Sequence, residues 1–190
     1  MKLCQRIDVR QLAIQSGVVQ SVADHESVRD DEPGEVDLDL DLAGDEVRFP
    51  ATPQRPAFEA ARAAGLHLTC HAGEAGDPSH VEEALDLGAE RIAHGVIGAG
   101  DARVAARLQN EGIVLDMCPT ANWKTKAVPT LADHPLPRLV RAGVRCTIST
   151  DSRTVANTTL THEFELMAAI GMTDEELQLC NRTAYAAKFG

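Results

Sequence analysis

Aromatic residues, basic charge and long apolar runs are all scarce in this chain of 190 residues. Phe, Tyr and Trp together make up 3% of the sequence, and the excess of Asp and Glu gives a net charge of −11. Binding to a nucleic-acid backbone needs a basic surface, so we expect no nucleic-acid partner. No apolar run approaches the roughly 18 residues of a membrane span, and the N-terminus does not resemble a signal peptide. We therefore expect a cytoplasmic protein with no membrane partner.

Paired cysteines are absent as well. The chain has five widely spaced cysteines and no C-x-x-C motif, which is typical of reduced thiols and not of a disulfide framework. Those that fall in or beside expected strands are expected to be small buried apolar residues. These are Cys70, Cys118 and Cys146.

Several metal and phosphate motifs are also missing. The chain has no H-E-x-x-H, and no H-x-E with P-C-x-x-C, so any metal site must be assembled from separate strands. It has no glycine-rich phosphate loop after an early strand. Its length and ordinary content of 44% hydrophobic and 25% charged residues predict one domain, residues 1–190, with a good core.

The central stretch of the chain is Leu66 to Glu74, Leu-His-Leu-Thr-Cys-His-Ala-Gly-Glu. Its apolar and polar residues alternate with the period of a strand that buries one face. Gly73 permits a sharp turn at the strand end, so His71 and Glu74 are expected to lie together there. An imidazole that can bind a metal, beside a carboxylate that can carry a proton, is a common hydrolytic pairing.

Strands and helices alternate along the rest of the chain, which predicts a parallel α/β fold. Helix 79–87 is expected to begin with a capping box of Ser79 and Glu82, and the last helix with one of Thr173 and Glu176. The expected strands are 2–6, 36–42, 66–71, 91–93, 113–117 and 144–149, and the expected helices are 9–16, 56–64, 79–87, 101–111, 135–142, 158–170 and 173–189.

Two parallel architectures fit this alternation, a doubly wound sheet and a (β/α)8 barrel. The missing glycine-rich loop disfavours the first. In barrels the functional residues come from the C-terminal ends of several strands, and this chain has polar residues at those ends. They are Gly44 to Glu46, His71 and Glu74, His94, Thr120 and Asn122, and Asp151. The barrel is therefore favoured.

Each of these residues also has an ordinary structural explanation. His94 fits a packing histidine, Asp151 an N-cap, and Asp41 a solvated loop carboxylate. Their recurrence at one strand end after another argues against chance. The other histidines show no ligand pattern and are expected to be surface or packing residues; they are His25, His67, His80, His134 and His162.

Five motifs, in this order along the chain, resemble the adenosine deaminases of the amidohydrolase superfamily. They are Asp-Leu-Ala-Gly-Asp-Glu (41–46), His-Ala-Gly-Glu (71–74), Arg-Ile-Ala-His-Gly (91–95), Cys-Pro-Thr-Ala-Asn (118–122) and Ser-Thr-Asp (149–151). The resemblance implies a (β/α)8 TIM-type barrel that hydrolyses the 6-amino group of adenosine and deoxyadenosine. The expected partner is therefore a small-molecule purine nucleoside, and the products are inosine or deoxyinosine and ammonia.

The same resemblance implies the roles of the site residues. His71 and Asp151 would bind one Zn²⁺, and Glu74 would donate a proton to purine N1. His94 would orient and deprotonate the zinc-bound water, and the backbone amide of Gly44 would contact the purine.

Two features depart from the family pattern. Ser152 stands where a second aspartate usually hydrogen-bonds the purine, which puts affinity and base preference in doubt. The His-x-His pair of the family's first strand, which supplies two more zinc ligands, is absent. Counting back from Asp151 at the eighth strand makes 2–6 the third. We therefore expect strands 3–8 of an N-terminally truncated barrel, with weak zinc binding, impaired activity and open sheet edges that favour self-association.

Three other functions remain open. The chain could be a deaminase for adenine or another 6-aminopurine derivative, or a non-catalytic barrel remnant that acts as a binding module. A metal-free lyase or aldolase barrel would need a Schiff-base lysine at a strand end. Lys124 and Lys126 lie in an expected loop after a strand, so this last alternative has little support.

Overall fold

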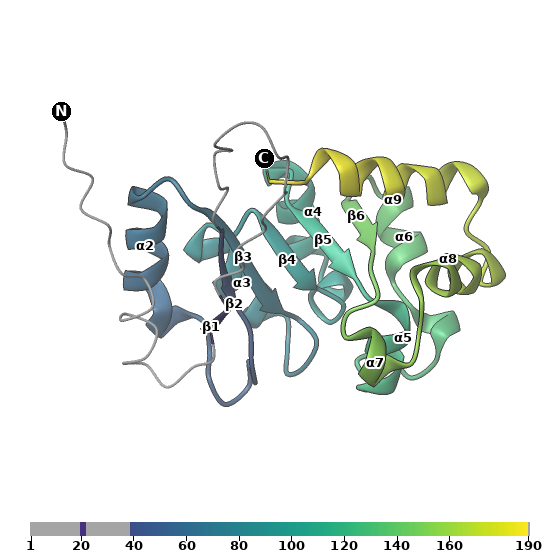
Figure 1. The fold of residues 1–190 in the computed structure, drawn as a ribbon, viewed down its shortest axis with the longest axis horizontal. Helices are drawn as coiled ribbons and strands as arrows, with labels where there is room; N and C mark the ends of the chain where they lie inside the picture. The colour runs from purple at the N-terminus through teal and green to yellow at the C-terminus, as the bar shows by residue number, and fades with distance from the viewer. Residues whose placement is uncertain (1–19, 22–38, 190) are drawn as a thin grey trace, which may run out of the picture.

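A six-stranded sheet forms the centre of the computed structural model, which describes residues 20–21 and 39–189 (Figure 1). The strands lie in chain order, and the last five run parallel. The first strand pairs antiparallel with the second, where a complete barrel would have a parallel neighbour. The strands are β1 (Gln20–Ser21), β2 (Asp39–Leu42), β3 (His67–Ala72), β4 (Arg91–His94), β5 (Val114–Met117) and β6 (Arg145–Ile148).

Helices connect successive parallel strands and pack against the sheet (Figure 1). The α-helices are α2 (Arg55–Ala63), α3 (Ser79–Leu87), α4 (Ala102–Glu111), α5 (Pro119–Lys124), α6 (Leu136–Arg141), α7 (Arg153–Ala156), α8 (Leu160–Ala169) and α9 (Asp174–Ala186). Short 3₁₀ turns are η1 (Thr52–Gln54), η2 (Gly98–Gly100) and η3 (Leu131–Asp133). Strand, helix and parallel strand in sequence are the repeating unit of a β/α barrel, so the described residues form a partial barrel.

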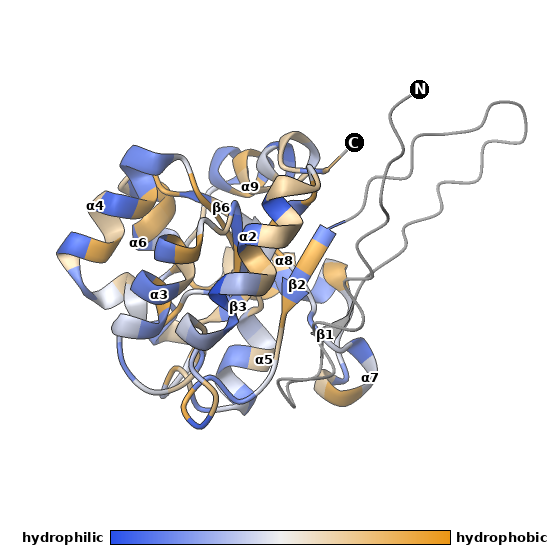
Figure 2. Cartoon of the chain, turned by 90° about the vertical axis from the view of Figure 1, so that its left-hand side faces the viewer, coloured by the Kyte–Doolittle hydropathy of each residue, from blue (hydrophilic) through white to orange (hydrophobic). Residues whose placement is uncertain are grey.

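The strands bury one face beneath the helices because their side chains alternate in polarity. Along β2 hydrophilic and hydrophobic bands alternate (Figure 2), and Leu40 and Leu42 are the buried residues. In β3 the buried residues are Leu68, Cys70 and Ala72. Together with the apolar faces of the helices they make one continuous core.

The opposite face of the sheet is polar and is linked from strand to strand. Thr69 on β3 donates a hydrogen bond to Asp41 Oδ1 on β2 at 2.7 Å. On the next strands, Arg91 pairs with Asp116 at 2.7 Å, and Thr147 donates to the same carboxylate at 2.7 Å. This face corresponds to the inside of a barrel. The pairs Asp41–Thr69 and Asp116–Thr147 are register partners, whereas Arg91 reaches Asp116 diagonally because its partner on β5 is Val114.

Most of the expected elements are confirmed within one to three residues at each end. Helices α3 and α4 end at C-cap glycines in the left-handed region, Gly88 and Gly112, and α6 is followed by Gly143 in the same region, one residue after its C-cap Ala142. The capping box of Thr173 and Glu176 is present. The expected elements at 2–6 and 9–16 lie outside the described residues, as does the first part of 36–42.

Other expectations at helix ends were wrong. Ser79 does not cap α3: Pro78 is the N-cap, and Asp77 accepts the Ser79 N–H at 2.8 Å. Asp151 does not cap α7, because Ser152 is the N-cap residue. The segment after Cys118, expected as a loop, begins with α5, which has a proline in its first turn. The last helix ends at Ala186 and not at Phe189.

The four cysteines of the described segments are free and buried, which confirms the expected burial of Cys70, Cys118 and Cys146 and adds Cys180 to them. Burial raises the pKa of each thiol, that of Cys180 to about 11, so these side chains behave as small apolar residues. None of the helices in the described segments has the length and apolar character to cross a membrane. No described strand pairs with the outer edge of β6, so self-association through an edge stays a prediction.

A series of glycine substitutions tests the turn after β3. Gly73 has a φ of +77°, and a Cβ there would lie 2.7 Å from Val81 Cγ2 and 3.1 Å from Gly95 Cα. Gly65 has a φ of +79° with open space, so it carries backbone strain alone. We expect Gly73→Ala to lower the free energy of unfolding by roughly 2–4 kcal/mol and Gly65→Ala by about 1 kcal/mol. Urea denaturation measures both.

Gly100→Ala is the control for this series, because Gly100 has neither a positive φ nor a neighbour within 4 Å of the added Cβ. Its stability should be close to that of the unchanged chain. Equal losses for Gly73→Ala and Gly65→Ala would show that the close approach of the turn to Gly95 does not matter.

Candidate active site

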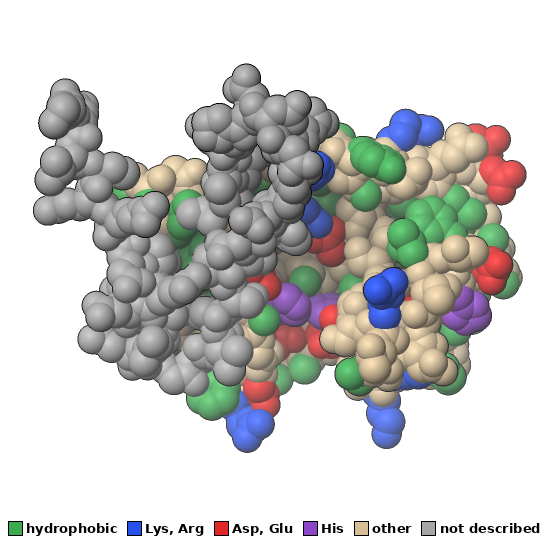
Figure 3. All heavy atoms as spheres, viewed as in Figure 1, with side chains coloured by type: hydrophobic (Ala, Val, Ile, Leu, Met, Phe, Trp, Pro, Cys, Tyr) green, Lys and Arg blue, Asp and Glu red, His purple; other side chains and the backbone are tan. Residues whose placement is uncertain are grey.

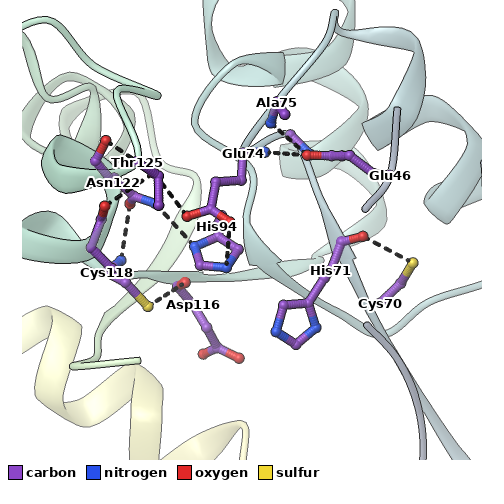
Figure 4. Close-up of polar contacts among 12 residues, drawn as sticks. Glu46, Cys70, His71, Glu74, Ala75, His94, Asp116, Cys118, Asn122 and Thr125 are labelled. Atoms are coloured by element: carbon purple, nitrogen blue, oxygen red, sulfur yellow. Dashed lines mark hydrogen bonds and ion pairs between the residues drawn. The ribbon is translucent and has the colours of Figure 1, made fainter. Parts of the chain in front are cut away.

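Two histidines and a glutamate meet at the C-terminal ends of β3 and β4. The rings of His71 and His94 have centroids 5.4 Å apart, and His94 Nε2 lies 3.6 Å from Glu74 Oε2 (Figure 4). Figure 3 shows histidine and acidic side chains side by side near the middle of one face. The register of the sheet causes this meeting, because Ala72 pairs with His94 across the two strands.

His71 lies beside an acid on the neighbouring strand. Its Nδ1 is 3.4 Å from Asp41 Oδ1, and this buried nitrogen makes no well-aligned hydrogen bond. Burial by itself lowers the pKa of His71, but the Asp41 carboxylate and the charge of Asp151 outweigh it, so the pKa is raised. Asp41 is therefore a partner of the site, and its explanation as a solvated loop carboxylate was wrong.

His94 is held in an unusual backbone conformation at the end of β4. Its φ is +71°, in the left-handed region that side chains other than glycine rarely adopt, and its residue exposure is 2%. Burial lowers the pKa of His94, and the carboxylate of Glu74 opposes that shift. Asp151, with a φ of +53°, is a second left-handed residue at a strand end. Strained backbone of this kind concentrates at functional sites.

The Glu46 carboxylate holds the loop that carries Glu74. It accepts hydrogen bonds from the backbone N–H groups of Gly73 (2.6 Å), Glu74 (2.8 Å) and Ala75 (2.5 Å), as Figure 4 shows in part. The end of β2 is thereby tied to the turn after β3. The sequence placed Glu46 at a strand end but assigned it no role, because which N–H groups it would meet depends on strand order.

The Glu74 side chain is positioned from the other side by α5. Thr125, the C-cap of this helix, donates to Glu74 Oε1 at 3.0 Å. Asn122 in the same helix lies with its Nδ2 3.0 Å from His94 Nδ1, and His134 Nε2 lies 3.3 Å from Asn122 Oδ1. Sequence reasoning missed Thr125 and treated His134 as an ordinary histidine, whereas the structure buries His134 and joins it to the site.

A cavity of about 140 Å³ opens beside His71 and is lined in part by Gly44 and Phe49. A Cβ at Gly44 would meet nothing within 4 Å. Asp151 and Ser152 are exposed, and the Ser152 side chain makes no capping hydrogen bond. The structure thus brings Glu74, His71 and His94 together, while the roles expected of these three residues and of Gly44, Asp151 and Ser152 all stay predictions.

The described residues do not by themselves complete a zinc site. His71 offers a buried imidazole nitrogen without a well-aligned hydrogen bond, and the charge of nearby Asp151 acts on it. Within residues 20–21 and 39–189, however, no group of three or more His, Cys, Asp or Glu side chains could hold a metal ion. Catalytic zinc is normally bound by three protein ligands, so two candidates are too few.

These observations define a class of protein. It is a partial β/α barrel of the amidohydrolase type, with a histidine–glutamate pair at its strand ends. Residues 9–189 match the family model "Adenosine deaminase", and the chain belongs to the adenosine deaminase family. It is 42% identical over 139 residues to an adenosine deaminase of Pectobacterium atrosepticum, covering 72% of this chain and 41% of that protein. It is 40% identical over 146 residues to an adenine deaminase of Streptomyces coelicolor, covering 76% of this chain and 43% of that protein.

Solved structures show the same likeness. An adenine deaminase from Arthrobacter aurescens aligns with a TM-score of 0.76 and 31% identity, over 80% of this chain and 47% of that one. An amidohydrolase from Burkholderia ambifaria, solved with bound Zn, aligns with a TM-score of 0.72 and 26% identity, over 79% of this chain and 43% of that one. The chain thus spans less than half the length of these relatives.

Substitution of Glu46 tests the loop contact. In Glu46→Gln one carboxylate oxygen becomes an amide NH₂, so at least one of the three N–H groups loses its acceptor. We expect a loss of about 1–3 kcal/mol in the free energy of unfolding, and faster amide hydrogen exchange at residues 73–75. Glu59→Gln, at an exposed position on α2, is the matched control and should change neither quantity. Unchanged exchange in Glu46→Gln would contradict a holding role.

Acid pH tests the burial of His134. Burial lowers the pKa of His134 to about 4 from its ordinary value near 6.5. The unfolded chain therefore takes up a proton between pH 6.5 and 4 that the folded chain refuses, so stability falls as pH falls through this window. We expect the wild type to lose up to about 3 kcal/mol more than His134→Gln between pH 7 and pH 4, measured by denaturant unfolding.

His162→Gln serves as the matched control, since His162 is exposed on α8. Its stability should follow the pH dependence of the wild type. A wild-type curve that runs parallel to that of His134→Gln would contradict the burial of a neutral imidazole.

Proposed function

We propose that this chain carries the side chains that donate a proton and orient the water in the zinc-dependent hydrolytic deamination of adenosine and deoxyadenosine. The observation that carries the proposal is the pair of His94 and Glu74, 3.6 Å apart at the strand ends of a barrel in the adenosine deaminase family. Thr125 and Glu46 hold Glu74 in place, which a proton-transferring group requires.

The reaction replaces an amino group with an oxygen. A water oxygen bonds to purine C6, the C6–N bond breaks, and inosine or deoxyinosine and ammonia are the products. In the proposed scheme Glu74 donates a proton to purine N1, which makes C6 more electrophilic, while His94 orients the attacking water. The water loses two protons in all: one leaves with the amino group as ammonia, and the other restores the Glu74 carboxyl. The backbone of Gly44 and the hydroxyl of Ser152 contact the purine from the two sides of the site.

We further propose that His71 and Asp151 are two of the ligands of one Zn²⁺ and that the remaining ligands come from outside the described residues. The proposal is supported by the zinc bound to the related amidohydrolase of B. ambifaria and by the buried nitrogen of His71. Because two ligands hold zinc weakly, impaired activity is expected of the chain alone.

Adenine is a second candidate substrate. Relatives named adenosine deaminase and adenine deaminase are about equally similar to this chain, at 42% and 40% identity. Ser152 stands exposed where an aspartate usually contacts the purine, so base recognition differs from the pattern on which the nucleoside assignment rests. A comparison of adenosine, deoxyadenosine and adenine in one assay separates the two candidates.

Substitution of Glu74 tests the proposed reaction. The purified chain with added Zn²⁺ is expected to convert adenosine to inosine slowly, followed by the change in ultraviolet absorbance. A fusion that places the first two β/α units of an adenosine deaminase in front of this chain should convert it faster. Glu74→Gln is expected to lower either rate by about 10²–10⁴-fold, because the proton donor is lost.

Glu59→Gln, on the exposed face of α2, should leave these rates unchanged. A folded fusion that turns over adenine and not adenosine would replace the nucleoside assignment with the second candidate. A folded fusion that converts none of the three substrates would contradict the proposed function.

A further inference from the structure

His94 is the first of three buried polar side chains in a row, and the proposed reaction does not use the other two. Asn122 is 0% exposed, His94 2% and His134 4%. The three side chains follow one another at hydrogen-bonding distance, His134 to Asn122 and Asn122 to His94. None of the three carries a carboxylate or an ammonium group. Their effect on the site therefore depends on which of their atoms donate hydrogen bonds and which accept them.

Backbone N–H groups fix the direction of this row, because they can only donate. The N–H of Cys118 donates to Asn122 Oδ1 at 3.2 Å. The N–H of Leu136 donates to His134 Nδ1 at 3.3 Å, so a neutral His134 carries its hydrogen on Nε2 and donates it to the same Asn122 oxygen at 3.3 Å. Burial lowers the pKa of His134 to about 4, which keeps this ring neutral near pH 7.

Asn122 therefore has one orientation that satisfies its neighbours. Its Oδ1 accepts from Cys118 and His134, and its Nδ2 faces His94 Nδ1 at 3.0 Å. The reversed amide would place an NH₂ group against two donors. Since NH₂ can only donate, His94 Nδ1 accepts, and the hydrogen of a neutral His94 is left on Nε2.

We propose that Asn122 and His134 are positioning residues that hold His94 as the Nε2–H tautomer, so that His94 presents a hydrogen-bond donor to the site. The role of this donor in catalysis rests on the proposed deamination. The assignment of the tautomer is independent of that function. Nε2 is the nitrogen that faces Glu74, and Figure 4 shows Asn122 and Glu74 on either side of the His94 ring. A protonated Nε2 can bind the lone pair of an attacking water and orient it, but it has no lone pair to receive a proton or a metal ion.

The element that carries Asn122 is itself anchored. The buried carboxylate of Glu163 accepts the N–H of Thr120 in the first turn of α5 at 2.9 Å, and it also accepts the hydroxyl of Thr158. The N–H of Val128 donates to the Asn122 carbonyl at 3.2 Å. These bonds hold the backbone of Asn122, so its amide has little freedom to follow a change in the His94 ring.

The tautomer can be measured directly on the full chain of 190 residues. With ¹⁵N-labelled histidine, a long-range ¹H–¹⁵N spectrum distinguishes the protonated ring nitrogen from the unprotonated one, and His94→Asn identifies the His94 signals by their loss. We expect a single neutral form of His94 with the hydrogen on Nε2, and the same tautomer for His134. A His94 ring with its hydrogen on Nδ1, or a mixture of the two forms, would overturn the proposal.

Asn122→Asp should reverse the tautomer with almost no change in shape. The new carboxylate still accepts from Cys118 and His134, but it offers His94 Nδ1 an acceptor in place of a donor. We expect the hydrogen of His94 to move to Nδ1, or both nitrogens to be protonated. Asn110→Asp, at an exposed position on α4, adds the same charge and should leave the His94 signals unchanged.

The outcomes separate this inference from the proposed function. An Asn122→Asp spectrum like that of the wild type would show that Asn122 does not set the tautomer. If that variant does not fold, the wild-type spectrum alone decides. The expected tautomer in a protein that deaminates no purine would leave the positioning role in place and remove the proposed function.

Discussion

Backbone hydrogen bonds between the parallel strands β2 to β6 hold five strand ends at one edge of the sheet, and the site depends on this pairing. A shift by one residue would turn every side chain to the opposite face. In the observed register, Asp41 pairs with Thr69 and Ala72 pairs with His94. The apolar side chains then lie beneath the helices, and the polar ones line the inner face where the site forms.

Two histidines of the site have opposite pKa shifts although their rings are 5.4 Å apart. His71 lies next to the Asp41 carboxylate, which outweighs burial and raises the pKa. His94 is more deeply buried and lies against the neutral amide of Asn122, so burial lowers the pKa. The two rings therefore differ in charge tendency because their nearest neighbours differ, a carboxylate for His71 and an amide for His94.

Membership of the adenosine deaminase family is a property of this chain, whereas residues 20–21 and 39–189 hold no group of three or more His, Cys, Asp or Glu side chains that could bind a metal ion. The family is established by the match over residues 9–189, while the relatives are more than twice as long as the aligned part. The described residues do bring Glu74 and His94 together, with Thr125 and Asn122 bonded to them. Catalytic zinc normally needs three protein ligands, and the two that we propose, His71 and Asp151, do not reach that number.

The sequence by itself determined the five parallel strands and most of the helices, because alternation and terminal glycines are local signals. It did not indicate the short strand β1 at Gln20–Ser21. It also determined the residues at the strand ends, since the motifs that contain Glu74 and His94 are contiguous. Only the tertiary structure decided which groups hold them. Glu46 and Gly73 are 27 residues apart, and Thr125 and Glu74 are 51 apart. His134 reaches the site through Asn122, and no local pattern distinguishes it from a surface histidine. Contacts between strands and helices depend on strand order and register, which the spacing of residues along a chain does not encode.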